Sequence, residues 1–217
     1  MRFLSLLAMF FCMACEDNKQ AVEQASVDTK NLTLTDTVNG TKNIWIDPLN
    51  GNIYPLPDSI AGEPVSFYLG NPKIISLAKD FYTGNFRPTD DDSTTRLLSQ
   101  VVTDDSTIRP FYRWCLDFTI SISDGALGEY PGSPSLKYAI KFPNEFFGFM
   151  DEDKSGERYK RWTEIIAYSG LIDRQTSEIE KQISNQMLEN CHSCGIIAKK
   201  RILTFAKDII NEIKLQD

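Results

Sequence analysis

The stretch RPFYRWCLDFTISISDGALGEYPGSPSLKYAIKFPNEFFGFMDEDKSGERYKRWTEIIAYSG, residues 109–170, decides the fold of this chain of 217 residues. It holds most of the large aromatic side chains, including two of the three tryptophans, Trp114 and Trp162. Its apolar residues recur mainly three or four positions apart, the spacing that gives an α-helix one apolar face. We therefore expect this stretch to form the core of a mostly helical domain.

The first helix of this stretch is predicted to begin near Pro110 and to end at Asp124-Gly125. Its apolar face follows the i, i+3, i+4, i+7, i+8, i+11 pattern and consists of Phe111, Trp114, Cys115, Phe118, Thr119 and Ile122. Cys115 is therefore expected to be a small buried residue. Three further helices are predicted over 133–142, 144–150 and 157–169, and Pro143 separates the first two because proline breaks a helix.

Helical periodicity extends toward the N-terminus as well. Asn71 is a good N-cap and Pro72 suits the first helical position, so a helix is predicted to begin there and to stop at Gly84. Another helix is predicted over 94–103. The acidic run 90–92 precedes it, where negative charge favours a helix N-terminus.

Two longer helices, over 176–190 and about 195–215, are predicted to close the chain. The sequence shows no clear internal repeat, so a regular solenoid is not indicated.

Residues 43–70 have a different pattern. An Asn-Gly pair at 50–51 is a strong turn signal, and apolar residues flank it on both sides: Trp45, Ile46, Ile53 and Tyr54. A small hairpin followed by an extended, proline-rich arm is predicted here.

These patterns together predict a mostly α fold. We expect an antiparallel helical bundle or array with a small extended or hairpin N-terminal portion, forming a single domain over 43–217. Residues 15–42 are mostly polar and lack aromatic side chains, which favours a flexible tether. The alternation in 31–38 is instead compatible with a short strand.

The first residues have the pattern of an export signal. Met1-Arg2 supplies a positive region, and the nearly continuous apolar run 3–14 is about 12 residues long, too short to cross a bilayer that needs about 20. We therefore interpret 1–14 as a signal peptide. Ala14-Cys15 resembles the lipobox of bacterial lipoproteins, although Cys12 and Met13 depart from the usual residues. An ordinary cleaved signal without lipid is the alternative.

The lipoprotein resemblance implies that Cys15 is lipidated and becomes the new N-terminus. Two acyl chains anchor a protein stably, whereas one anchors it only marginally. Glu16-Asp17 looks like the acidic signal that directs some lipoproteins to the cell surface. We therefore expect a protein of the cell envelope, lipid-anchored in the outer membrane, on its periplasmic or its surface side.

The charge of the chain disfavours nucleic acid as a partner. The sequence holds 23 basic and 30 acidic residues, and removal of Arg2 with the signal peptide leaves 22 against 30, a net charge of −8. Such a surface repels phosphate backbones. We expect the membrane, reached through the lipid on Cys15, and a protein as partners.

Cys191-His192-Ser193-Cys194 forms a CxxC motif between two predicted helices. Thioredoxin-like enzymes place this motif after a strand, and c-type haem sites place His where this chain has Gly195. A zinc site from Cys115, Cys191, His192 and Cys194 has suitable ligand types but no second paired motif. We favour a disulfide between Cys191 and Cys194 at the turn between the helices.

Asp151, Asp153 and Ser155, followed by Gly156, match the first half of an EF-hand calcium loop. The bidentate glutamate that such a loop needs at its twelfth position is Trp162 here. We therefore favour a solvated turn that caps the next helix, and we expect neither a metal nor another cofactor.

Catalytic motifs are sparse. His192 is the only histidine and lies between the two cysteines, and the chain contains no nucleophile elbow, zinc-protease motif, P-loop or dinucleotide-binding fingerprint. Hydrolysis by paired carboxylates needs no histidine and could use Asp117, Asp124 or Glu129.

We therefore expect a lipid-anchored binding or interaction protein of the cell envelope, without catalytic activity. A narrower version is an immunity or inhibitor protein whose acidic surface binds a basic toxin or hydrolase. The alternatives are a carboxylate-based glycan hydrolase and an accessory protein for nutrient uptake.

Overall fold

The computed structural model describes residues 43–169, 176–192 and 194–216. The predictions for the signal peptide, for Cys15 and for the tether lie outside these residues. Thr41–Asp217 forms one compact unit, and the buried residues of its core extend from Trp45 to Ile210.

The N-terminal portion contains the predicted hairpin. Strands β1 (Ile44–Ile46) and β2 (Ile53–Pro55) pair antiparallel, with Trp45 opposite Tyr54. Gly51 has a φ of 74°, which the turn requires and which glycine adopts without steric cost. A second short ladder joins β3 (Ser59–Ile60) to β4 (Glu63–Pro64). The hairpin prediction is confirmed.

Two short helices correct the prediction for the segment that follows. The arm expected to be extended includes α1 (Val65–Gly70), whose Tyr68 is buried. The next helix, α2 (Ser76–Tyr82), begins several residues after Asn71, so Asn71 is not its N-cap. The Asn71 side chain instead accepts a hydrogen bond from the Lys73 amide, and this local turn competes with helix initiation.

The acidic run 90–92 has the predicted capping role. Asp91 is the N-cap of α3 (Asp92–Leu98), and its carboxylate accepts a hydrogen bond from the Thr94 amide over 3.0 Å. A short 3-10 helix, η1 (Ser99–Val102), extends α3. The helix predicted over 94–103 is therefore confirmed, with an earlier start and a tighter last turn.

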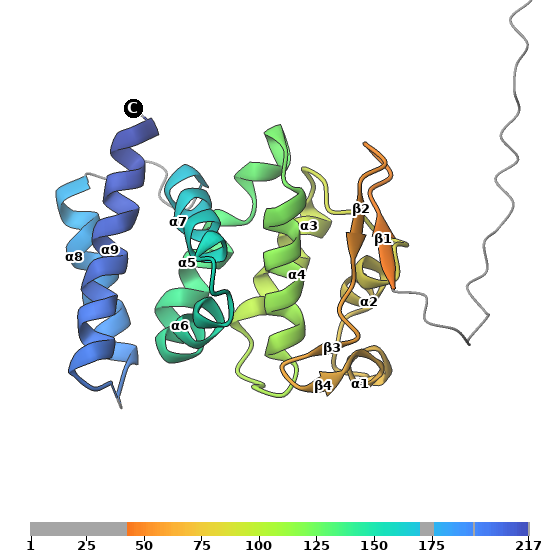
Figure 1. Cartoon of the computed structure of the whole chain (residues 1–217), viewed down its shortest axis with the longest axis horizontal. Helices are drawn as coiled ribbons and strands as arrows, with labels where there is room; N and C mark the ends of the chain where they lie inside the picture. Colours follow the sequence, from red (N-terminus) through yellow and green to blue (C-terminus); the bar gives the residue numbers. More distant parts are fainter. Residues whose placement is uncertain (1–42, 170–175, 193, 217) are drawn as a thin grey trace, which may run out of the picture. The chain divides into compact units, whose positions relative to one another are not determined.

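Helix α4 (Arg109–Ile122) has packing partners on two sides. One side carries Phe111, Trp114 and Phe118, which contact the rings of Trp45, Phe81 and their neighbours from the hairpin and α2. The other side faces the C-terminal helices. Figure 1 shows α4 between the hairpin and these helices.

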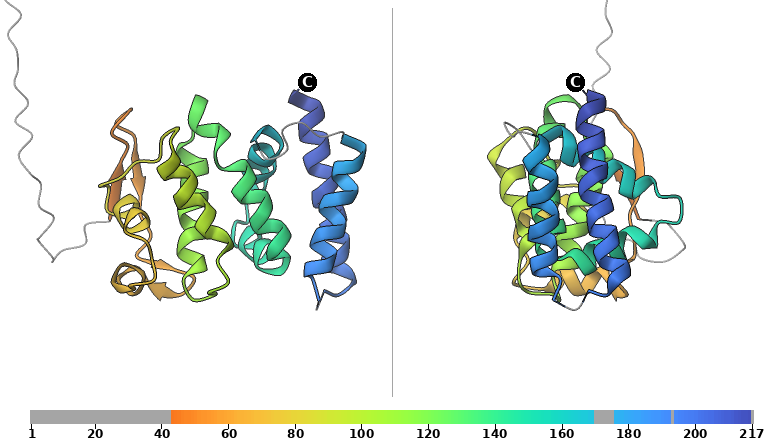
Figure 2. Two further views of the ribbon diagram at one scale, coloured as in Figure 1. Left: turned by 180° about the vertical axis from the view of Figure 1, so that it is seen from behind. Right: turned by 90° about the vertical axis from the view of Figure 1, so that its left-hand side faces the viewer.

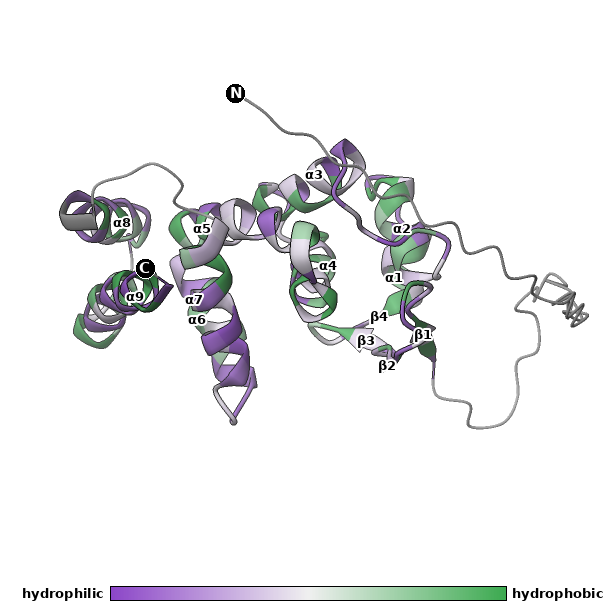
Figure 3. Cartoon of the chain, turned by 90° about the horizontal axis from the view of Figure 1, so that it is seen from above, coloured by the Kyte–Doolittle hydropathy of each residue, from purple (hydrophilic) through white to green (hydrophobic). Residues whose placement is uncertain are grey.

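The remaining chain forms η2 (Gly125–Glu129), α5 (Gly132–Lys141), α6 (Pro143–Glu152), α7 (Glu157–Ser169), α8 (Thr176–Asn190) and α9 (Ile196–Gln216). Helix α5 packs on α7 and α8, and α9 packs on the same two helices, so these four close a bundle. Figure 3 shows α8 and α9 nearly end-on, beside α5 and α7. Trp162 and Phe205 are completely buried within the bundle.

The predicted fold class is confirmed: the described residues are mostly helical, with two small antiparallel ladders near the N-terminus. Successive helices of the bundle run in opposite directions (Figure 1). Within the described parts of the chain, no helix is both long and apolar enough to cross a bilayer.

Candidate functional site

The residues of the half EF-hand motif bind other parts of the protein. The Asp153 carboxylate accepts hydrogen bonds from the Ser155 hydroxyl (2.6 Å) and from the Arg158 amide in the first turn of α7 (2.7 Å). The Ser155 hydroxyl and the backbone amides of Arg158 and Ser155 lower the pKa of Asp153 to about 2. This is the helix-capping role that we favoured over calcium binding.

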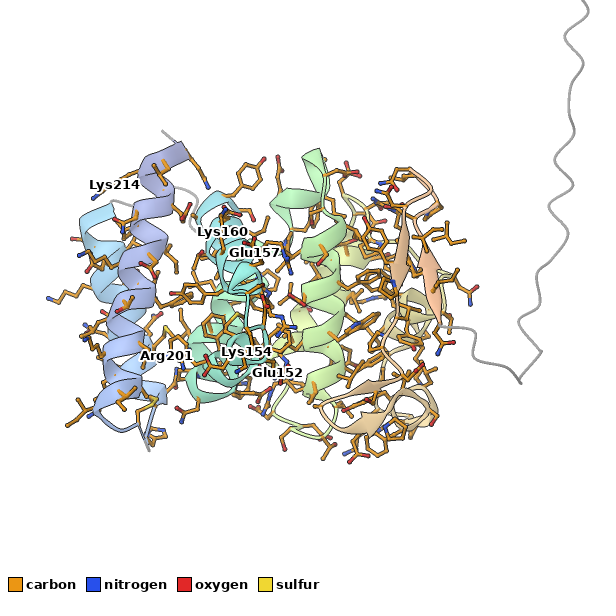
Figure 4. The ribbon with its side chains drawn as sticks, viewed as in Figure 1. Glu152, Lys154, Glu157, Lys160, Arg201 and Lys214 are labelled. Carbon is orange, nitrogen blue, oxygen red and sulfur yellow. A yellow bond between two sulfur atoms is a disulfide. The ribbon has the colours of Figure 1, made fainter. Side chains whose placement is uncertain are left out.

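Asp151 is held by α9. Both of its carboxylate oxygens accept hydrogen bonds from Arg201, over 2.7 and 2.8 Å, and the guanidinium lies 4.4 Å from the centre of the Phe147 ring. Figure 4 shows Arg201 beside the turn that carries Glu152 and Lys154. The Arg201 hydrogen bonds keep the pKa of Asp151 below its ordinary value.

The proposed zinc ligands are separated. A disulfide joins Cys191 to Cys194, His192 between them is exposed, and Cys115 is buried on α4. Burial raises the pKa of the Cys115 thiol well above its ordinary value, so the thiol stays protonated. Among the described residues, no three His, Cys, Asp or Glu side chains are placed to hold one metal ion.

The three carboxylates named for hydrolysis have different surroundings. Asp117 accepts a hydrogen bond from the buried Trp162 indole (2.8 Å) and lies 3.5 Å from the Arg158 guanidinium. Glu129 ends η2. Of the three, Asp124 alone lines the pocket described below. Asp117 and Glu129 therefore lie outside the lining of the pocket to which Asp124 contributes.

A buried ionic network was missed by the sequence analysis. Arg109 and Arg113 on α4 both contact Glu145 on α6, over 2.9 and 3.3 Å, and the Tyr138 hydroxyl donates to the same carboxylate over 3.0 Å. The i, i+4, i+8 spacing of Arg109, Arg113 and Asp117 was a signal, because it places three charged residues on one side of a helix. This network joins α4 to the C-terminal helices.

The candidate binding site is a pocket of about 630 Å³ where the C-terminal ends of α4, α7 and α9 meet η2. These helix ends lie together at the top of Figure 1. We call it the Tyr168 pocket because the Tyr168 ring, 53 % exposed, forms part of its wall. Gly128 lies beside this ring, and a Cβ built on it would be 3.4 Å away, at the limit of ordinary van der Waals contact.

Three carboxylates from three elements line the same pocket as the Tyr168 ring: Asp124 after α4, Glu164 on α7 and Glu212 on α9. The pocket also contains Arg161, whose Nε is buried without a hydrogen-bond partner. The lining therefore carries a net charge of −2. Ion pairs to these carboxylates are long: Asp124 lies 3.6 Å from Arg87, and Glu164 lies 3.8 Å from Lys160. An acidic pocket with an exposed aromatic ring suits a cationic group.

A second hollow, of about 710 Å³, lies between α6, α7 and α9. Its charged groups are largely used within the protein, because Asp151 binds Arg201 and Asp208 accepts a hydrogen bond from Tyr159 over 2.8 Å. Burial and the neighbouring Asp208 raise the pKa of Tyr159 above its ordinary value, so this pair stays intact at neutral pH. The carboxylates of the Tyr168 pocket are therefore more available to a ligand than those of the second hollow.

Comparison with known proteins gives no relative from which a function can be transferred. No protein-family model, curated protein or solved structure matches this chain.

Proposed function

We propose that this chain is a lipid-anchored binding protein of the cell envelope, and that its Tyr168 pocket receives a basic side chain of a protein partner. The export signal followed by Cys15 supports the anchor, and the net charge of −7 supports a basic partner. The observation that carries the proposal is the pocket itself, whose lining combines three carboxylates with an exposed aromatic residue.

A lysine or arginine side chain is opposite in charge to the lining of the pocket. Its aliphatic part can lie against Ile120 and Ile165, while its charged end reaches Tyr168 and the carboxylates. A cation over an aromatic face gains about 0.5–2 kcal/mol, and carboxylates at the rim add attraction that salt screens. A basic toxin or hydrolase, the partner of an immunity or inhibitor protein, is one kind of protein that carries such a side chain.

The partner is tested by crosslinking and affinity purification of the full-length protein from its native membranes, followed by mass spectrometry. We expect a stoichiometric protein partner whose recovery falls about tenfold in Tyr168→Ala and in Glu164→Lys, because each change removes part of the cation site. Matched controls are Phe67→Ala, another exposed aromatic residue, and Glu180→Lys on α8. Equal recovery with all four variants would exclude the Tyr168 pocket as the binding site.

The anchor is tested separately. We expect Cys15→Ser to abolish incorporation of a labelled fatty acid and to prevent processing of the signal peptide, because the thiol is the acylated group in lipoproteins. Labelling and the mass of the N-terminal peptide measure this directly. Unchanged labelling in Cys15→Ser would rule out lipidation at this residue, whatever the result for the Tyr168 pocket.

A further inference from the structure

Helix α9 has a charge opposite to that of the rest of the chain. Its 21 residues contain four lysines and one arginine against one aspartate and one glutamate, a net charge of +3 in a chain of −7. The exposed lysines are Lys199, Lys200, Lys207 and Lys214. Positive charge is therefore concentrated on the last helix of the domain.

The exposed side of α9 combines these lysines with aliphatic side chains. Ile196 and Ile197 in the first turn are 88 and 80 % exposed, Leu203 is 53 % exposed, and Leu215 in the last turn is 79 % exposed. We call the exposed residues Ile196, Ile197, Lys199, Lys200, Leu203, Lys207, Lys214 and Leu215 the α9 face. Four large aliphatic side chains in water on one helix are costly unless something covers them.

The fold holds this face outward. Ile202, Phe205 and Ile209, on the opposite side of α9, are completely buried, so the helix cannot rotate to hide its exposed side chains. Figure 2 shows α8 and α9 side by side, with no described element in front of them in the right-hand view. Lys214 marks the C-terminal end of the face in Figure 4.

The two acidic residues of α9 line the two pockets, and Asp208 shares the second hollow with Ile197 and Lys200 of the α9 face. Asp208 accepts a hydrogen bond from Tyr159, and Glu212 lines the Tyr168 pocket. Arg201 is paired with Asp151 at the surface. The neighbouring α8 exposes charges of both signs, Glu178, Glu180, Lys181 and Glu189, so the basic surface is confined to α9.

We propose that the α9 face docks on an anionic lipid surface. Lysine ammonium groups remain hydrated near lipid headgroups while exposed aliphatic side chains enter the interface, which is how amphipathic helices bind membranes. Lysines favour this over an acidic protein surface, because bidentate pairing to carboxylates is the property of arginine and the one arginine of α9 is already paired. The inference rests on α9 alone and does not require the Tyr168 pocket.

Such docking would orient the domain. A lipid on Cys15 limits the distance from the membrane but sets no orientation, whereas a second contact through α9 fixes which side faces the bilayer. Two attachments together also bind more stably than either one alone.

The test uses the segment Thr41–Asp217, which contains the whole core and lacks the signal peptide and Cys15. Its co-sedimentation is measured with phosphatidylcholine vesicles and with vesicles that contain about 30 % phosphatidylglycerol. We expect binding to the anionic vesicles that weakens with added salt, and at least about tenfold weaker binding to phosphatidylcholine.

Two variants with equal charge change separate the α9 face from net charge. We expect Lys200→Glu with Lys207→Glu to weaken binding to anionic vesicles at least about tenfold. The control, Lys137→Glu with Lys160→Glu, changes two exposed lysines of α5 and α7 and should lose less than about twofold. Ile197→Asp should also weaken binding, whereas Leu49→Asp in the hairpin turn should not. Far-ultraviolet circular dichroism verifies that each variant is folded.

Equal affinity for the two kinds of vesicle, or equal losses in the two lysine variants, would overturn the proposal. So would an absence of vesicle binding. If the full-length protein instead loses a captured acidic protein when Lys200 and Lys207 are changed, the α9 face binds protein rather than lipid. None of these outcomes depends on Tyr168 or on Cys15, so failure here and failure of the proposed function are distinguishable.

Discussion

Glu145→Ala is expected to lower the free energy of unfolding by about 3 kcal/mol, because it leaves two buried guanidinium groups without their carboxylate. The Arg109 and Arg113 side chains are only 8 and 7 % exposed, and both contact Glu145. Each also lies over an aromatic ring, Phe142 at 3.7 Å and Phe149 at 4.2 Å, and a ring cannot replace the lost charge. Chemical denaturation of the variant and the wild type measures the difference.

Two comparisons separate charge from packing in this network. Glu152→Ala removes an exposed carboxylate 3.7 Å from Arg158, and it should cost less than about 1 kcal/mol. Changing Arg109, Arg113 and Glu145 together to methionine should recover much of the stability lost by Glu145→Ala, because no buried charge is left unpaired. If the triple variant is less stable than Glu145→Ala, the network stabilises through attraction rather than through avoidance of an unpaired charge.

Asp47→Asn is the second change with a large expected effect, also about 3 kcal/mol. The Asp47 side chain is fully buried and receives two hydrogen bonds from Arg87, over 2.7 and 3.2 Å, and Arg87 is only 6 % exposed. Asparagine has nearly the same volume as aspartate and can still accept the hydrogen bond from the Leu49 amide. The loss of stability therefore measures the contribution of the Asp47 charge. Asp90→Asn, at an exposed position, is the matched control and should cost less than about 0.5 kcal/mol.

The same pair predicts a dependence of stability on pH. Burial alone raises the pKa of Asp47, but hydrogen bonds from Arg87 and from the Leu49 amide outweigh it, so the folded pKa lies below its ordinary value. A carboxylate with a lowered folded pKa contributes stability above its unfolded pKa of about 3.9, and this contribution is lost as pH falls through the folded pKa. The stability difference between wild type and Asp47→Asn should therefore narrow below about pH 4.

Asp105 and Asp153, whose pKa values are lowered to about 2, titrate in the same range. They are unchanged in both proteins, so their contributions cancel in the difference. The free energies of unfolding of wild type and Asp47→Asn are compared from about pH 7 to about pH 2.5. A difference that stays constant over this range would show that the charge of Asp47 does not stabilise the fold.

Local patterns predicted the helices that bury one regular apolar face. The spacing from Phe111 to Ile122 predicted α4, and the Asn-Gly pair predicted the turn between β1 and β2. The same reasoning was wrong at Asn71, where the signals for a cap and a first-turn proline were present without a helix start. There the Ile75 amide donates a hydrogen bond to the Tyr112 hydroxyl of α4, outside the segment, and such a contact cannot be read from local sequence.

The residues of the candidate site were harder to predict from the sequence than the helices, because they come from distant parts of the chain. Asp124 was singled out from the sequence, but Tyr168 and Glu212 were not, because they lie 44 and 88 positions from it in the chain. Their assembly follows from the packing of α7 on α9 and of η2 on α7. Sequence spacing on one helix indicates a shared face, but it gives no information about which distant helix end completes a pocket.

The mostly helical class, the hairpin, the positions of most helix ends and the excess of acidic charge could all be predicted from the amino-acid sequence. These properties follow from local rules: apolar periodicity, capping residues, turn residues and counts of charge. Only the packing of the helices placed Glu145 beside two arginines, brought three carboxylates into the lining of the Tyr168 pocket, and left the lysines of α9 exposed. The reason is that each of these depends on which helices pack together, and packing is selected by the fit of whole surfaces rather than by any single stretch of chain.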